Sequence, residues 1–416
     1  MTMRREVVAT CAAQACAQIG AFSVAALIPT LIPAWGLTNT EAGWISGIYY
    51  AAYTVVVPLL SSLTDRVDAK RIYLGSVALT ALAFAGFAWA ATGFWTALGF
   101  RALMGIGWAG SYMPGLKALS DLTEGPGQSR AVAAHAASVG VSAALSFGVA
   151  GAVNVWLGWR WALVPGALGA ALAFLFVLIG LPARPPHPSA GPRPALLDFR
   201  PVLRNRSALA YSLAYCVHTW EMSALRAWVV AFLTFAALRG DGAWVPLAPA
   251  TVASVMGLVG VWASVWGNEL SIRLGRRRFI LGTMLVSAAM AAVVGFGAAL
   301  PYWGTAALVL GYAVLIWSDS SSLTAGSAGS AEPGRRGATL AVHSTLGYAG
   351  GFVGPLALGA TLDLLGGASV LGWGLAFGHV TLVLIAGAIA FVALRPADLA
   401  GDRAAVARRQ ATSPRA

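Results

Sequence analysis

The chain has 416 residues, of which 58% are hydrophobic and only 10% are charged, and its formal net charge is +12. This composition excludes an ordinary soluble domain, because the surface of such a domain needs more polar residues than the chain supplies. A positive charge can also indicate a nucleic-acid partner, so the placement of the basic residues decides what the charge means.

Long charge-poor runs predict helices that cross a bilayer. A spanning helix needs about 20 apolar residues, and its backbone satisfies its own hydrogen bonds inside the hydrocarbon. The fold class is therefore predicted to be all-α and integral to the membrane, with twelve transmembrane helices. The twelve runs are 7–33, 42–63, 72–92, 96–117, 131–154, 160–181, 207–237, 250–270, 279–299, 304–325, 338–363 and 370–394.

The basic residues lie almost entirely on one side of these runs. Of the 27 Lys and Arg residues, 23 fall at the termini or in alternate loops, whereas only Arg160 and Arg239 fall on the other side. Cytoplasmic loops of membrane proteins carry this excess. We therefore predict a multi-pass protein of a bacterial-type inner membrane with both termini in the cytoplasm, and no nucleic-acid partner. The first run is too long for a signal peptide and is predicted to stay.

The chain repeats itself at a spacing of about 207 residues. The segment 63–75 matches the segment 270–282 at its Leu, Arg, basic-pair and Gly positions, and a shift of 208 places His135 on His343. Six runs per half give both halves the same orientation. The repeat predicts two pseudo-symmetric six-helix bundles, at 1–181 and 207–394. A cytoplasmic linker rich in Pro and Arg, 182–206, joins them, and a cytoplasmic tail, 395–416, follows.

The loop at 61–71 resembles the loop between helices 2 and 3 of the major facilitator superfamily. It matches that family's charged positions at Asp65, Arg66, Lys70 and Arg71, while Ser61 and Asp68 stand where the family has glycines. The start of helix 4, "RALMGIGWAG" (101–110), and "LGWRWAL" (157–163) are also similar to that family. The resemblance covers nearly the whole chain and implies secondary transport by alternating access.

The resemblance further implies a conformational gate at this loop. Asp65 and Arg66 would form a breakable charge contact with neighbouring helices, which suits a two-state gate. The alternative is that the basic residues of the loop serve as anchors on the cytoplasmic side, and one residue can do both.

Few ionisable residues lie inside the predicted spans. Each costs at least about 2.5–3.5 kcal/mol at the bilayer centre, so each is expected to face a cavity or a partner. They are Arg101, His135, His218, Glu221, Arg226, Asp319, His343 and His379.

Three of these residues cluster in "YCVHTWEMSALRAW" (215–228), in the middle of helix 7. His218 and Glu221 are three residues apart and share a helix face. Arg226 lies about 140° around the helix from Glu221, so the two cannot form a standard pair on one helix. At least one of them is expected to meet another helix, a substrate or water; the alternative is a buried structural network between helices.

We predict roles for these residues from their chemistry. Glu221 and Asp319 are the candidates for proton coupling, although Asp319 also fits a polar inner gate. Arginine keeps its proton and suits an anion receptor. The predicted substrate site comprises Arg101, Arg226, His218, Tyr215 and Gln14, the last being the counterpart of Glu221 in the first half.

Other features are expected to be structural. Gly347, Gly351 and Gly354 have the spacing that lets helix backbones approach closely, and Ser138, Ser142 and Ser146 form a similar stripe in the first half. The three cysteines lie in separate positions without zinc spacing, so we predict no metal and no cofactor.

The sequence predicts a proton-coupled secondary transporter of a small anionic solute, and the resemblance to the major facilitator superfamily implies a monomer. No Gly-rich phosphate-binding loop is present, which argues against ATP as the energy source. Proton-driven efflux of a cationic or amphipathic compound is the alternative within transport. A membrane-embedded enzyme or sensor is the alternative of another class; an enzyme would need a catalytic set of residues that the sequence does not supply.

Overall fold

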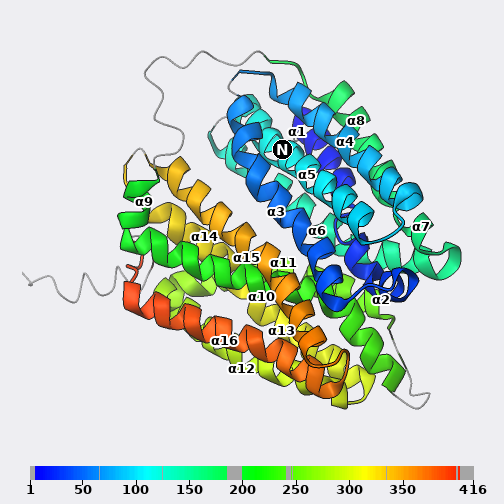
Figure 1. Ribbon diagram of the computed structural model, residues 1–416. Coiled ribbons are helices and arrows are strands. Elements are labelled where there is room, and N and C mark those ends of the chain that lie inside the picture. Colours follow the sequence, from blue (N-terminus) through cyan, green and yellow to red (C-terminus); the bar gives the residue numbers. More distant parts are fainter. Residues whose placement is uncertain are drawn as a thin grey trace, which may run out of the picture. The chain divides into compact units, whose positions relative to one another are not determined.

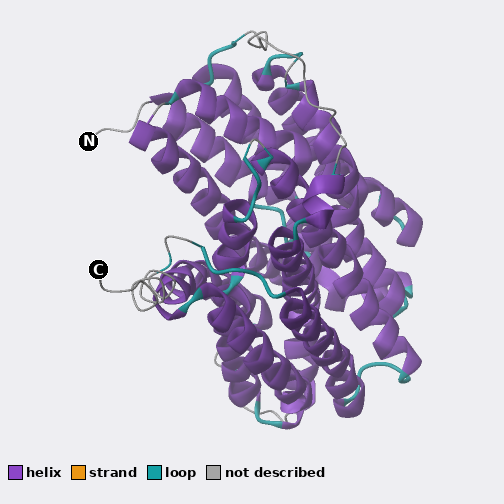
Figure 2. Cartoon of the chain, turned by 90° about the vertical axis from the view of Figure 1, so that its left-hand side faces the viewer, coloured by secondary structure: helices purple, strands orange, loops and turns teal. Residues whose placement is uncertain are grey.

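The computed structural model describes residues 5–64, 66–123, 125–184, 199–239, 245, 247–333, 335–399 and 402. Every regular element among them is a helix (Figure 2). Ten helical segments in this part of the chain are long and apolar enough to cross a membrane. The chain is therefore an all-α membrane protein.

The described residues of the first half form eight helices. They are α1 (Arg5–Gln18), α2 (Ser23–Trp35), α3 (Asn39–Leu63), α4 (Ala69–Ala90), α5 (Phe94–Leu122), α6 (Gly125–Leu157), α7 (Trp159–Ala162) and α8 (Val164–Gly180).

The second half contains a similar series. Its helices are α9 (Arg200–Arg204), α10 (Arg206–Arg239), α11 (Pro249–Leu274), α12 (Arg276–Phe296), the 3₁₀ turn η1 (Gly297–Ala299), α13 (Tyr302–Ser318), α14 (Ser320–Gly329), α15 (Arg336–Leu364) and α16 (Val370–Leu394).

Two predicted spans, 96–117 and 338–363, are helices but lie outside the ten. They correspond to α5 and α15, which are 29 residues long each. Both are interrupted by several glycines and by charged residues, which lower their hydropathy. Length and composition therefore identify ten spans, and the count of twelve stays a prediction.

The chain forms two compact units. Unit 1 comprises Met1–Gly191, Arg226–Thr234 and Val245–Leu258, and unit 2 comprises Pro192–Leu225, Phe235–Trp244 and Val259–Ala416. Within unit 1, α4 packs against α5 and α8, and α1 packs against α8 (Figure 1). Within unit 2, α12 packs along α16.

Two predicted spans are broken in the middle. The run 7–33 forms α1 and α2, separated by turns at 19–22, and the run 304–325 forms α13 and α14, separated at Asp319. Inside a bilayer, such a break must have its backbone groups satisfied by neighbouring groups. In the first break, the backbone N–H of Phe22 donates to Ser146 Oγ at 3.0 Å. Broken helices place polar backbone where a transporter binds its cargo.

Glycines of α15 bring this helix against α10. A Cβ at Gly350 or Gly354 would collide with the backbone carbonyl of Cys216 or Trp220, and one at Gly347 would collide with the ring of Tyr215. Thr219 Oγ1 also donates to the Gly347 carbonyl. These small residues allow the close approach of the two backbones.

A short strap follows α16 and lies against unit 2; we define it as Arg395–Leu399 together with Asp402. Tyr211 of α10 donates its hydroxyl to the Ala397 carbonyl at 2.8 Å. Arg276, at the start of α12, forms a buried ion pair with Asp402, with Nη2 and Oδ1 2.9 Å apart. Its Nη1 donates to the Ser322 carbonyl of α14 at 3.1 Å. The strap thus joins three helices of one unit.

Candidate functional site

A buried cluster of ionisable residues lies within unit 2. His218 Nδ1 of α10 and Asp319 Oδ1 lie 2.9 Å apart, which is ion-pair distance. Neither atom has the angles of a hydrogen bond in this arrangement. His218 is 2% exposed and Asp319 is 4% exposed, so the pair is shielded from solvent. The break between α13 and α14 places the Asp319 carboxylate against the middle of α10.

Glu221 adds a second carboxylate to this cluster. Its side chain is 3% exposed, one turn beyond His218 on α10. Asp319 lies near enough to repel it, and the hydroxyls of Tyr312 and Ser287 are its polar neighbours. Its Oε1 nevertheless has no hydrogen bond of good geometry. A charged His218 would balance one carboxylate only, so the second needs a proton or a cation to become neutral.

Two further rings, one on α10 and one on α15, extend the cluster. The Tyr215 ring stacks on His218 at a centroid distance of 5.6 Å and on His343 of α15 at 4.0 Å. His343 Nε2 in turn lies 3.2 Å from Thr324 Oγ1 of α14. The structure therefore brings together Tyr215, His218, Glu221 and Asp319, and it adds His343, which is not part of the predicted substrate site.

Arg101 is buried in unit 1, where its guanidinium contacts the backbone at the break between α1 and α2. It is 2% exposed, and its Nη2 donates to the Ala21 carbonyl at 3.0 Å. Its guanidinium also lies over the ring of Tyr49, 4.1 Å from the centroid. Its Nε atom is buried without a partner. Carbonyl and ring stabilise the cation but do not neutralise it.

Arg226 lies beside the same break. Its guanidinium carbon is 5.0 Å from the centroid of the Phe22 ring, and both residues belong to unit 1. Phe22 is thus one neighbour of Arg226, whereas Tyr312 and Ser287 are polar neighbours of Glu221. Gln14, the counterpart of Glu221, accepts a hydrogen bond from the Tyr73 hydroxyl of α4 at 2.9 Å, while its Nε2 is buried and unpaired.

The predicted gate loop is described only in part. Asp65 lies outside the described residues, whereas Arg66 and Arg71 are exposed. Lys70 donates from Nζ to the Leu178 carbonyl at 2.8 Å. Each of these roles in gating stays a prediction.

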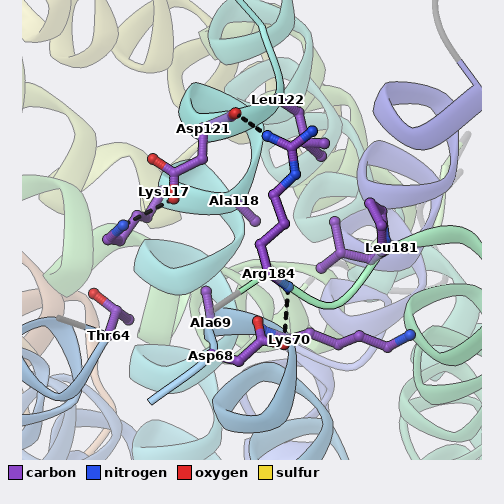
Figure 3. Close-up of a pocket in the computed structure, with 11 residues that line it drawn as sticks. Thr64, Asp68, Ala69, Lys70, Lys117, Ala118, Asp121, Leu122, Leu181 and Arg184 are labelled. Carbon is purple, nitrogen blue, oxygen red and sulfur yellow. Dashed lines mark hydrogen bonds and ion pairs between the residues drawn. The ribbon is translucent and has the colours of Figure 1, made fainter. Parts of the chain in front are cut away.

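Asp68, which stands where the family has a glycine, caps α4 instead. Its φ is −51°, which any residue can adopt, and its carboxylate accepts from the backbone N–H of Lys70 at 2.9 Å. It also accepts from the backbone N–H of Arg184 at 3.1 Å, while the guanidinium of Arg184 reaches the Asp121 carbonyl (Figure 3). In the second half the equivalent residue, Gly275, has φ +95°, which only glycine adopts readily. The two halves therefore make the same turn in different ways.

Some residues of these sites were not found from the sequence. Tyr312 precedes Asp319 by seven residues and so lies on the same helix face, a signal that could have found it. Ser287 and Tyr49 carry no such signal, because nothing in a single sequence says which helices are neighbours. His379, one of the ionisable residues inside the predicted spans, accepts a hydrogen bond from Trp220 Nε1 at 3.1 Å. In the part of the chain that is described, no three His, Cys, Asp or Glu residues are grouped to hold a metal.

Comparison with known proteins identifies relatives. The chain is 26% identical to human protein spinster homolog 1 over 274 residues, which are 62% of this chain and 51% of that protein, and the bovine protein matches equally well. The chain therefore spans about half the length of the curated relatives it matches.

Solved structures show the fold. A bacterial homolog of the human lysosomal transporter spinster, inward-facing and unoccupied, superposes with a TM-score of 0.70 at 15% identity, covering 94% of each chain. The nucleoside transporter NupG superposes with a TM-score of 0.72 at 14% identity, covering 95% of this chain and all of that one. The family model described as Major Facilitator Superfamily matches residues 10–252, more than half of the chain. The chain belongs to the major facilitator superfamily, a family of secondary transporters and not of enzymes, and it is similar to spinster.

Proposed function

We propose that the protein is a proton-coupled transporter that moves a small anionic solute by alternating access. The observation that carries this proposal is the buried cluster of His218, Glu221 and Asp319, which holds two carboxylates and one imidazole away from solvent. Intramembrane clusters of this kind mark ion and proton pathways. We further propose that the protein is a monomer with twelve spans in two six-helix halves. The excess of basic residues on one side supports cytoplasmic termini.

The proposal that the solute is an anion rests on two arginines. Arg101 and Arg226 lie beside consecutive residues, Ala21 and Phe22, at the break between α1 and α2. Guanidinium groups bind carboxylates and phosphates through paired hydrogen bonds. The described neighbours of Arg101 are a carbonyl, the sulfur of Met104 and the ring of Tyr49, none of which carries a formal negative charge, so an incoming anion would supply one.

A cationic or amphipathic cargo is the second candidate, and a specific observation favours it. Glu221 and Asp319 place two carboxylates beside one histidine, next to the ring of Tyr215. A cation could be held there by charge and by the aromatic ring. In that case the acidic cluster would bind the cargo as well as the proton.

Substitution of Arg226 separates the two candidates. Proteoliposomes with an imposed pH gradient would be assayed for flux of a panel of anions and cations. We expect Arg226→Ala to lower anion flux at least about tenfold, because one guanidinium contact to an anion contributes about 1.5–3 kcal/mol. Arg239→Ala is the matched control, since Arg239 lies on the same helix α10 but is exposed at its end. If Arg226→Ala leaves anion flux intact, the anionic class is wrong; cation flux that depends on Glu221 would support the second candidate.

A further inference from the structure

An apolar groove runs along α1 on the surface of unit 1. Its first part, of about 560 Å³, lies between α1 and α8 and is lined by Val8, Ala9, Ala12, Phe176 and Ile179, among others. Its second part, of about 440 Å³, continues past Ala15 and Ile19 between α1, α6 and α8. Leu172 lines both parts, so they form one groove.

The groove has a floor of small residues and walls of exposed apolar side chains. Ala9, Ala12 and Gly180 keep the floor low, while Ile179 and Val8 are 73% and 50% exposed. These walls lie on spans that cross the bilayer, so lipid chains are the apolar partner at hand. From Arg5 to Cys16 the groove follows α1 for about 17 Å at ~1.5 Å per residue. This length accommodates a lipid chain, since one leaflet contributes about 15 Å of hydrocarbon.

One end of the groove is basic. Arg5 lines this end beside Ile179 and Gly180, and its side chain is exposed. Lys70 does not line the groove but lines a separate pocket, and its Nζ donates to the Leu178 carbonyl in the last turn of α8. The positive end is the one that the basic-residue pattern predicts to face the cytoplasm, where membranes carry anionic headgroups.

We propose that this groove binds one anionic phospholipid, with an acyl chain along α1 and its phosphate at Arg5 and Lys70. The site differs from the buried polar cluster of unit 2 and from the arginines at the helix break, so it holds a resident lipid and not the transported solute. The basic residues favour an anionic headgroup. The small residues of the floor leave room for an acyl chain to lie inside the groove.

Native mass spectrometry of the detergent-purified protein tests the proposal. Phosphatidylglycerol and phosphatidylcholine with identical acyl chains would be titrated separately, and inorganic phosphate would be added as a third arm. We expect preferential binding of phosphatidylglycerol and a loss of about fivefold in its affinity for Arg5→Gln, since each basic residue near anionic lipid contributes about 1 kcal/mol. Ala12→Trp, which fills the groove, should lower the affinity for both lipids.

Two matched control variants carry substitutions outside the groove. Arg273→Gln removes an exposed arginine of unit 2, and Leu382→Trp changes an exposed apolar residue of α16; both should bind phosphatidylglycerol as the parent chain does. Arg5→Gln combined with Lys70→Gln should abolish the preference for phosphatidylglycerol. Equal binding of both lipids by the parent chain, an unchanged preference in the double variant, or displacement of lipid by inorganic phosphate alone would each overturn the proposal.

Discussion

His218 contacts one of two buried carboxylates that a bilayer would ordinarily exclude, and the three residues together determine the charge of the cluster. Asp319 contacts it directly, and Glu221 lies one turn further along α10. The imidazole can balance a single negative charge, so the second carboxylate changes state only when a proton or a cation enters or leaves. Glu221, whose Oε1 lacks a well-formed hydrogen bond, is the carboxylate that we propose to exchange the proton.

Glu221→Gln should separate transport from its driving force. The amide keeps the shape of the side chain but cannot exchange a proton, so we expect pH-gradient-driven uptake to fall at least about tenfold while downhill exchange of solute persists. Counterflow and gradient-driven flux in proteoliposomes measure the two separately. Glu269→Gln is the control, because Glu269 is an exposed partner of Arg273 on α11. Unchanged uphill uptake in Glu221→Gln would remove this residue from proton coupling.

The members of this cluster could be predicted only in part. Ionisable residues stand out in an apolar run because each raises the free energy of insertion into the bilayer. This cost alone identifies Glu221, His218 and Asp319 as candidates. Their assembly could not be predicted, because helical spacing tells which residues share a face but not which helix that face meets. The pairing of His218 with Asp319 depends on how α10 meets the break at Asp319, and this is a tertiary property.

At the scale of elements, close helix packing fixes where α15 lies on α10. Gly354→Ala should destabilise the protein by about 1–3 kcal/mol, because the new methyl would collide with the Trp220 carbonyl, which belongs to a rigid backbone. Thermal unfolding in detergent measures the loss. Gly378→Ala, on α16 with open space around its Cβ, is the matched control and should leave the midpoint nearly unchanged.

Helix positions were predicted well, but helix breaks were not. Hydropathy located the spans because burial in lipid requires long apolar runs. The break at 19–22 is invisible to hydropathy, since its residues are apolar or small. It is instead stabilised by distant groups, namely Ser146 and Arg101, whose contacts with the segment arise only in the folded chain.

For the whole molecule, the predicted sidedness has a direct test. Thr92, in the turn after α4, and Glu332, in the turn after α14, should lie on opposite sides of the membrane. Single cysteines at these positions would be probed with a membrane-impermeant maleimide on intact cells and on inverted vesicles. We expect Thr92→Cys to react only from outside and Glu332→Cys only from inside. The opposite pattern would reverse the topology, and labelling of both from one side would contradict the count of spans between them.

The repeat relates two turns of the chain that are built by different local chemistry. A shift of 207 residues relates Asp68 to Gly275, yet one residue caps a helix through its side chain and the other uses a backbone conformation open to glycine. Equivalent positions thus keep a turn while exchanging the chemistry that makes it. For this reason a duplicated sequence indicates shared helices more securely than shared residue roles.

The strap after α16 limits where the chain can be shortened or fused to another protein. Hydropathy alone would suggest Leu394 as the natural end, but a cut there removes Asp402 and leaves Arg276, which is 3% exposed, as a buried cation without its carboxylate. Loss of one partner of such a pair typically costs about 3–5 kcal/mol. A chain ending at Leu394 should therefore lose its monodisperse peak in size-exclusion chromatography, whereas one ending at Arg403 should keep it. A fluorescent reporter or an affinity tag belongs beyond Asp402.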